Sequence, residues 1–129
     1  MQAVLLDTSL MLDCAKRKID VFAGLDGLME CAWEARISEG VMRELNAKAL
    51  IRGPKGAEAR LALAMIEVRR AQGRVIVEEN KDNVDGWLLA RGRELGAIVC
   101  TNDADVRMRA RAAGLKVISV LNNSRLGYA

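Results

Sequence analysis

The chain has 129 residues, of which 51% are hydrophobic, and a formal net charge of +3 at pH 7. That length supports one hydrophobic core, so we expect a single domain over residues 1–129. No apolar run approaches the roughly 18 residues of a membrane span, and the N-terminal stretch lacks the basic region of a signal peptide. We therefore expect a cytoplasmic protein with no membrane partner.

Histidine is absent, and the three cysteines are widely spaced at Cys14, Cys31 and Cys100. An odd and scattered set of cysteines favours neither a disulfide framework nor a zinc site. We expect three buried free thiols, because unpaired cysteine is among the most buried residue types.

Short apolar runs along the chain predict the strands of a sheet. These runs occupy residues 4–6, 35–38, 75–77, 97–100 and 117–121. Apolar residues at three- and four-residue spacing predict helices at residues 10–14, 19–29, 40–49, 54–68, 84–95 and 105–113. Residues 122–129 are expected to form a polar tail. The alternation predicts an α/β fold, a single domain with a mainly parallel central sheet of about five strands flanked by helices.

Acidic residues stand where two of the predicted strands end. Asp7 follows the first strand, and Asp103 and Asp105 follow a fully apolar strand that should be buried on both faces. In open α/β sheets, ligands bind in the crevice at the carboxyl ends of the strands. Two further acids come within reach of this crevice if the two strands are neighbours. They are Glu44, beside an apolar helix stripe, and Asp85, in the first turn of a helix.

Each acid alone also has a simpler explanation. Glu44 fits a solvated helix charge, and Asp85 fits a first-turn carboxylate favoured by the helix dipole. Their convergence is harder to explain in that way, because four or five neighbouring carboxylates repel one another unless a cation neutralises them. In a chain without histidine, the fitting ions are the oxygen-liganded Mg²⁺ and Mn²⁺.

Such a metal centre suits the hydrolysis of phosphodiesters. Two hard cations about 3.5–4 Å apart can activate a water and stabilise the entering and leaving oxygens at phosphorus. The sequence has no histidine to serve as a base, no nucleophile elbow and no phosphate-binding loop. A glycosidase would use a carboxylate pair and would leave the other acids unexplained. A phospho-acceptor signalling domain would need an acidic pair after the first strand, which this chain lacks.

Four stretches together resemble the signatures of the PIN-domain family, in family order and across nearly the whole chain. They are Leu6-Asp7-Thr8-Ser9, residues 41–45 with Glu44, Val84-Asp85 followed by Leu88-Leu89-Ala90, and residues 99–105, Val-Cys-Thr-Asn-Asp-Ala-Asp. The Thr-Asn-Asp-x-Asp block is the most specific match, and the one at Glu44 is the weakest. The resemblance implies a metal-dependent ribonuclease on a three-layer fold, a parallel sheet with flanking helices.

The resemblance also implies roles for individual residues. The metal-binding and catalytic acids would be Asp7, Glu44, Asp85 and Asp103, with Asp105 as an accessory acid. Side chains that orient these acids would be Thr8, Ser9, Thr101 and Asn102. Ser9 departs from the family pattern, in which asparagine is frequent, and its shorter side chain predicts a less firmly held Asp7.

Within the family, residues 18–22 and the arginine run at 107–111 are most similar to archaeal stand-alone PIN proteins. Those proteins are related to nucleases that process small-subunit precursor ribosomal RNA. The similarity implies RNA as the partner, with ribosome-assembly factors and a homodimer as further candidates. Two alternatives stay open: a VapC-type toxin ribonuclease held by an antitoxin, and a non-catalytic RNA-binding PIN subunit.

Basic residues surround the predicted acidic site. Setting the five acids aside leaves 12 acidic residues against 20 basic ones, a balance that suits an anionic polymer. We expect RNA phosphates to bind Arg107 and Arg111, which share a helix face, and a second cluster made by Lys48, Arg52 and Lys55. A solvated helix surface is the alternative for both groups.

Overall fold

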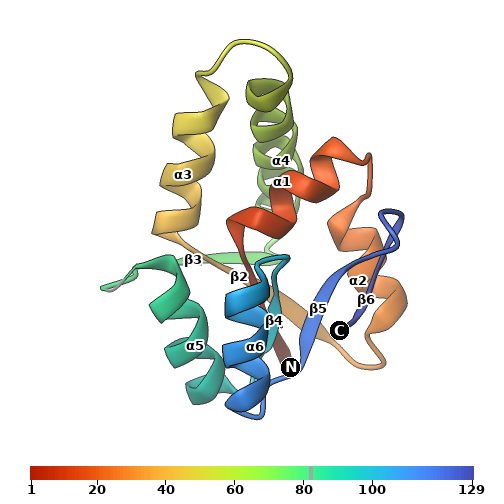
Figure 1. Ribbon diagram of the computed structural model, residues 1–129, viewed down its shortest axis with the longest axis vertical. Coiled ribbons are helices and arrows are strands. Elements are labelled where there is room, and N and C mark those ends of the chain that lie inside the picture. Colours follow the sequence, from red (N-terminus) through yellow and green to blue (C-terminus); the bar gives the residue numbers. More distant parts are fainter. Residues whose placement is uncertain (82) are drawn as a thin grey trace.

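A six-stranded sheet runs through the computed structural model, which describes residues 1–81 and 83–129 (Figure 1). The strands are β1 (Gln2–Leu6), β2 (Trp33–Ser38), β3 (Val75–Glu78), β4 (Ile98–Cys100), β5 (Val117–Leu121) and β6 (Arg125–Tyr128). Their order across the sheet is β3-β2-β1-β4-β5-β6, and every neighbouring pair is parallel except β5 with β6. The expected α/β fold with a mainly parallel sheet is confirmed, and β1 and β4 are the two central strands.

The strand β6 corrects the expected polar tail and raises the strand number from about five to six. Asn122 and Asn123 both adopt positive φ, 51° and 55°, which asparagine tolerates, and they reverse the chain after β5. Leu126 is thereby buried against the core. The sequence signal for this strand was weak, because Leu126 is its one large buried apolar side chain.

Helices cover both faces of the sheet. They are α1 (Thr8–Lys16), α2 (Val21–Leu28), α3 (Glu39–Ala49), α4 (Pro54–Ala71), α5 (Val84–Leu95) and α6 (Ala104–Ala112). Figure 1 shows α5 and α6 side by side on one side of the sheet, where their buried residues share a cluster with β1 and β4. The opposite face carries α1 and α2, and α3 and α4 pack against each other and against α1. This arrangement gives the three layers that the sequence implied.

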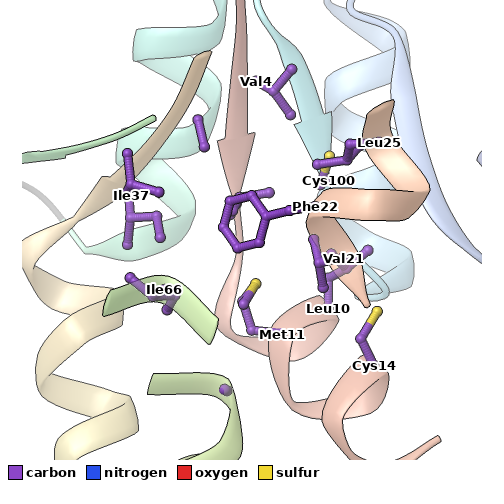
Figure 2. Packing of buried hydrophobic residues seen from close by; sticks show 14 of the residues in the cluster. Val4, Leu10, Met11, Cys14, Val21, Phe22, Leu25, Ile37, Ile66 and Cys100 are labelled. Carbon is purple, nitrogen blue, oxygen red and sulfur yellow. The ribbon is translucent and has the colours of Figure 1, made fainter. Parts of the chain in front are cut away.

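The central strands are apolar on both faces because each face meets a different set of helices. Val4 and Leu6 of β1 belong to the cluster under α1 and α2, whereas Ala3 and Leu5 belong to the cluster under α5 and α6. Phe22 lies in the middle of the first cluster (Figure 2). The sheet is therefore fixed from both sides, which makes the carboxyl ends of β1 and β4 a rigid base for side chains.

The cysteines correct one expectation. Cys14 and Cys100 are buried, and burial raises the pKa of the Cys14 thiol to about 12 and that of Cys100 still further. Cys31 is exposed, because it lies in the connection between α2 and β2 rather than on a core-facing element. No helix in residues 1–81 and 83–129 is long and apolar enough to cross a membrane.

Candidate functional site

The register of β1 against β4 brings the Asp7 and Thr101 positions together. Leu6 pairs with Cys100 at the carboxyl ends of the two strands, and the N–H of Asp7 donates to the carbonyl of Cys100 over 3.0 Å. The next residue of each chain segment, Asp7 and Thr101, therefore lies on the same edge of the sheet. The hydroxyl of Thr101 donates to Oδ2 of Asp7 over 2.7 Å.

Three donors fix the Asp7 carboxylate. Oδ2 accepts the hydroxyls of Thr101 and Ser9, the latter over 3.0 Å, and Oδ1 accepts the backbone N–H of Thr8 over 2.8 Å. The bond from Thr8 makes Asp7 the N-cap of α1. Ser9 therefore reaches Asp7 in spite of its short side chain, and how firmly it holds the carboxylate stays a prediction.

Asp7 is a buried carboxylate without a paired cation in the described chain. It is only 5% exposed, and burial raises its pKa above the ordinary value, with the Glu44 charge acting in the same direction. The hydrogen bonds from Thr101, Ser9 and Thr8 offset part of this effect. A charge held in this way is stabilised strongly by any cation that enters beside it.

Four of the five predicted acids line one pocket of about 320 Å³ at the carboxyl ends of the strands. The acids are Asp7, Glu44, Asp85 and Asp103, and the pocket is completed by Thr8, Ser9, Leu12, Lys48 and Val84. Glu44 is exposed on α3 and is nonetheless part of this lining. The sequence predicted that these four residues lie close together, and the structure places them in one pocket.

The fifth acid, Asp105, lies outside this lining at the start of α6. Its side chain is 64% exposed and accepts a hydrogen bond from Arg109 over 3.4 Å. Burial raises the pKa of Asp85, the charges of Asp7, Asp103 and Asp105 add to this, and Arg109 acts in the opposite direction. Asp105 and Arg109 therefore act on Asp85 electrostatically from the edge of the pocket.

Helix capping accounts for some of these acids only in part. Asn83, not Asp85, caps α5, because its side chain accepts the N–H of Gly86 over 2.7 Å. Asp103 does cap α6, with Oδ1 accepting the N–H of Val106 over 3.0 Å. One oxygen of Asp103 is used in this way, and the residue still lines the acid pocket.

The side chain of Asn102 holds the loop that carries Asp103. It makes no hydrogen bond to the acids of the pocket among the described residues. Its Nδ2 donates to Asp13 over 2.8 Å, and its Oδ1 accepts the N–H of Val120 over 3.0 Å. Its backbone N–H donates to the hydroxyl of Ser9 over 3.1 Å. Asp13, which also accepts from Arg17, was missed by the sequence reasoning. The only available signal was its place one turn after Ser9 on α1.

The predicted RNA-binding residues are placed differently from one another. Lys48 lines the acid pocket, Arg52 is exposed in the connection between α3 and α4, and Lys55 is exposed in the first turn of α4. Arg107 is half-buried on α6 and is not part of the pocket lining. Arg111 lines a separate cavity of about 570 Å³ at the amino ends of the strands, so the structure does not bring it to the acids.

That larger cavity is a poor candidate for the chemistry of the acids. Of the predicted acids, it contains none, and its lining includes Gln2, Lys116, Val117 and Tyr128. The smaller pocket holds the buried carboxylate and the raised pKa values, which are the marks of a functional site. We therefore place the candidate site at the acid pocket.

The donor chemistry of this pocket fits a hard divalent cation. Its charged ligands are carboxylate oxygens, which Mg²⁺ and Mn²⁺ prefer. The buried Oγ1 of Thr8, beside Asp7, has no hydrogen-bond partner among the described residues and is a further oxygen at the site. No three of the described acids or cysteines are already gathered as a cage.

The fold and the site together define a three-layer α/β domain with a carboxylate pocket at the carboxyl ends of parallel strands. A family model described as a PIN like domain matches residues 4–123. The chain belongs to the PIN-like domain family. The resemblance inferred from the sequence motifs is thereby confirmed.

Two solved structures are similar along almost the whole chain. The PIN domain endonuclease Utp24 is 26% identical, with a TM-score of 0.77, over 98% of this chain and 90% of that one. A domain of a functionally unknown protein from Methanocaldococcus jannaschii DSM 2661 is 17% identical, with a TM-score of 0.66, over 94% and 92%. The second likeness concerns the fold alone. Among curated proteins, no match was found.

Proposed function

We propose that the protein is a Mg²⁺- or Mn²⁺-dependent endoribonuclease that hydrolyses RNA phosphodiester bonds, with precursor ribosomal RNA as its substrate. The observation that carries the proposal is the pocket lined by Asp7, Glu44, Asp85 and Asp103. Membership of the PIN-like family and the similarity to the endonuclease Utp24 support nuclease activity. The ribosomal substrate rests on the sequence resemblance alone.

The residues of the pocket have separate tasks in this proposal. The four carboxylates hold the divalent cation, which when bound supplies an activated water and neutralises the phosphate charge. The hydroxyls of Ser9 and Thr101 orient Asp7. The ammonium of Lys48, the one basic group in the lining of this pocket, attracts the RNA phosphate.

Retention of all four acids in one pocket favours a catalytic role over an RNA-binding subunit without activity. Asp7 also caps α1, but burial raises its pKa, so the ionised carboxylate costs stability that helix capping alone does not require. We therefore do not adopt the non-catalytic alternative.

The test is cleavage of a generic structured RNA by the purified protein in chelator, in Mg²⁺ and in Mn²⁺. We expect cleavage only with a divalent ion, and none with the Asp103→Asn variant, which keeps the shape of the side chain and its helix-capping oxygen. Cleavage in chelator, or full activity of the Asp103→Asn variant, would refute the proposed chemistry.

A further inference from the structure

A second groove lies between the end of α1 and the start of α4. Its volume is about 380 Å³, and it is lined by Ala15, Lys16, Lys18, Pro54, Ala57, Glu58 and Leu61. The floor is largely apolar, and two lysines stand at one side. Neither the proposed catalytic chemistry nor the family match assigns a role to this groove.

The same helix borders both this groove and the acid pocket. Thr8, Ser9 and Leu12 of α1 line the pocket, and Ala15 and Lys16 of α1 line the groove. From Thr8 to Lys16 the helix rises about 12 Å. The helices α3 and α4 both pack against α1 (Figure 1). Thr8, Leu12 and Ala15 recur at helical spacing, so the two depressions follow each other along one face of α1.

The cations along this path are free of ion pairs in the described part of the chain. They are Lys16 and Lys18 beside the groove, Arg52 just before α4, Lys55 in the first turn of α4, and Lys48 in the acid pocket. Elsewhere on the surface, Arg36, Arg74 and Arg91 are bound to carboxylates. Cations without an ion pair are available for phosphates, and three of these five, Lys16, Lys18 and Lys48, line the two depressions.

We propose that a single strand of RNA leaves the acid pocket past Lys48 and lies in the groove between α1 and α4, with its phosphates at Lys16 and Lys18. The proposal rests on the function proposed above and adds the direction of the substrate. The substrate then lies on the side of α1, α3 and α4. It does not contact Arg111 at the far end of α6.

The chemistry of the groove favours a flexible single strand with little sequence preference. Pro54, Ala57 and Leu61 offer apolar surface to bases and riboses, and no aromatic ring is present for strong stacking. The carboxylate of Glu58 repels phosphate, which keeps the RNA backbone at the lysine side. Contacts to phosphates position the strand without reading its sequence.

The test compares RNA binding by variants that lose two positive charges each. The probe is a fluorescein-labelled single-stranded uridine oligonucleotide, and fluorescence anisotropy is measured in chelator across a salt series. For Lys16→Gln with Lys18→Gln, we expect about tenfold weaker binding at low salt. We also expect the slope of log affinity against log salt to flatten by up to about 1.4, which is about 0.7 per lost phosphate contact.

The matched control replaces two exposed cations away from this path, Arg93→Gln with Lys116→Gln. Both residues lack an ion pair in the described chain, and Lys116 lies at the amino end of β5. The control should keep the parent affinity and slope. Lys18 already has a positive φ of 58°, so glutamine there adds no backbone strain. A Lys16→Ala, Lys18→Ala pair, checked by thermal melting, guards against a folding defect.

The possible outcomes separate the proposed RNA path from the proposed nuclease chemistry. If the parent cleaves RNA but the Lys16, Lys18 variants bind with the parent slope, the path is wrong and the chemistry stands. If the variants lose affinity but the parent never cleaves with Mg²⁺ or Mn²⁺, the path stands and the proposed chemistry fails. A duplex of the same length that binds as tightly as the single strand, with an equal loss in the variants, also refutes the single-strand assignment.

Discussion

The carboxylates of Glu78 and Asp7 both stand at strand ends, but Glu78 is bound by charged groups and Asp7 by neutral ones. Glu78 at the end of β3 accepts hydrogen bonds from Arg36 and from Arg91, the latter over 2.9 Å. Burial would raise the pKa of Glu78, but these two guanidinium groups hold it below its ordinary value. Asp7 at the end of β1 is bound by hydroxyls and an amide, and its pKa is raised.

The difference separates an acid that serves the fold from an acid that serves a ligand. The charge of Glu78 is neutralised within the protein, and it ties β2 to α5 through two arginines. The carboxylate of Asp7 is oriented by hydrogen bonds, but its charge is not neutralised by any described basic side chain. This is so although the chain has 20 basic residues. The charge of Asp7 is therefore left for a cation from outside, whereas the charge of Glu78 is already neutralised by arginines.

The largest effect that this comparison predicts is on cleavage by the Asp7→Asn variant. The amide keeps the size of the side chain and removes the charge that holds the cation, so RNA cleavage should fall by more than about 100-fold. In chelator, the unfolding midpoint at neutral pH should not fall below that of the parent, because the variant loses a buried charge that has no counterion in the described chain. Cleavage rates and thermal melts measure the two quantities.

The matched change on the other side is Glu78→Gln, which leaves Arg36 and Arg91 without their charged acceptor. The free energy of unfolding should fall by about 1–2 kcal/mol, while RNA cleavage in Mg²⁺ stays near the parent rate. A loss of cleavage as large as that of Asp7→Asn, in a folded Glu78→Gln variant, would erase the distinction between the two acids.

A smaller effect is expected from Thr101→Val, which removes the hydroxyl that donates to Asp7 and accepts from the N–H of Asp103. Cleavage should fall about 10- to 100-fold, as for other residues that orient a metal ligand. Thr101→Ser keeps the hydroxyl and should restore most of the rate. Equal rates for the valine and serine variants would show that the hydroxyl does not orient Asp7.

Divalent ions should stabilise the parent, because they bind the native acid pocket and neutralise it. At a concentration about 100 times the dissociation constant, binding to the native state alone adds about 2.7 kcal/mol. Melting in chelator and in millimolar Mn²⁺ or Mg²⁺ measures this shift. The shift should persist in Glu78→Gln and be strongly reduced in Asp7→Asn, and a parent midpoint that ignores the ions contradicts a metal site.

Much of the site could be predicted because it follows from chain direction. Residues that follow buried parallel strands must lie at one edge of the sheet, and the pairing of β1 with β4 brings Asp7 and Asp103 together there. Asp85 needed one further step, since a helix that follows a parallel strand starts at the same edge of the sheet. Glu44 lies in the middle of α3, so its place depends on how that helix packs. Both residues line the pocket.

The parts that the sequence could not supply depend on helix rotation and on single side-chain contacts. Arg111 was expected beside the acids. It lies eight residues after Asp103, a rise of about 12 Å along α6, and so reaches the amino ends of the strands. Arg109, on the face of Asp105, is the arginine of α6 that acts on Asp85. The link from Asp13 to Asn102 joins segments 89 residues apart, and no local pattern encodes it.

The smallest effect predicted is a difference in how acid changes stability. The pKa of Glu78 is lower in the folded state than its ordinary value of 4.5, so its stabilisation is present above that value and is lost as pH falls through the folded pKa. The pKa of Asp7 is raised above 3.8 in the folded state, so its charge destabilises the fold increasingly as pH rises through that higher pKa. Urea unfolding from about pH 3 to about pH 8 in chelator separates the two contributions. Relative to the parent, Glu78→Gln should lose stability mainly at neutral pH and converge with it in acid. The free energy of unfolding of Asp7→Asn should rise relative to that of the parent as pH rises. If the two variants instead show the same dependence of unfolding free energy on pH, the two carboxylates are not held differently.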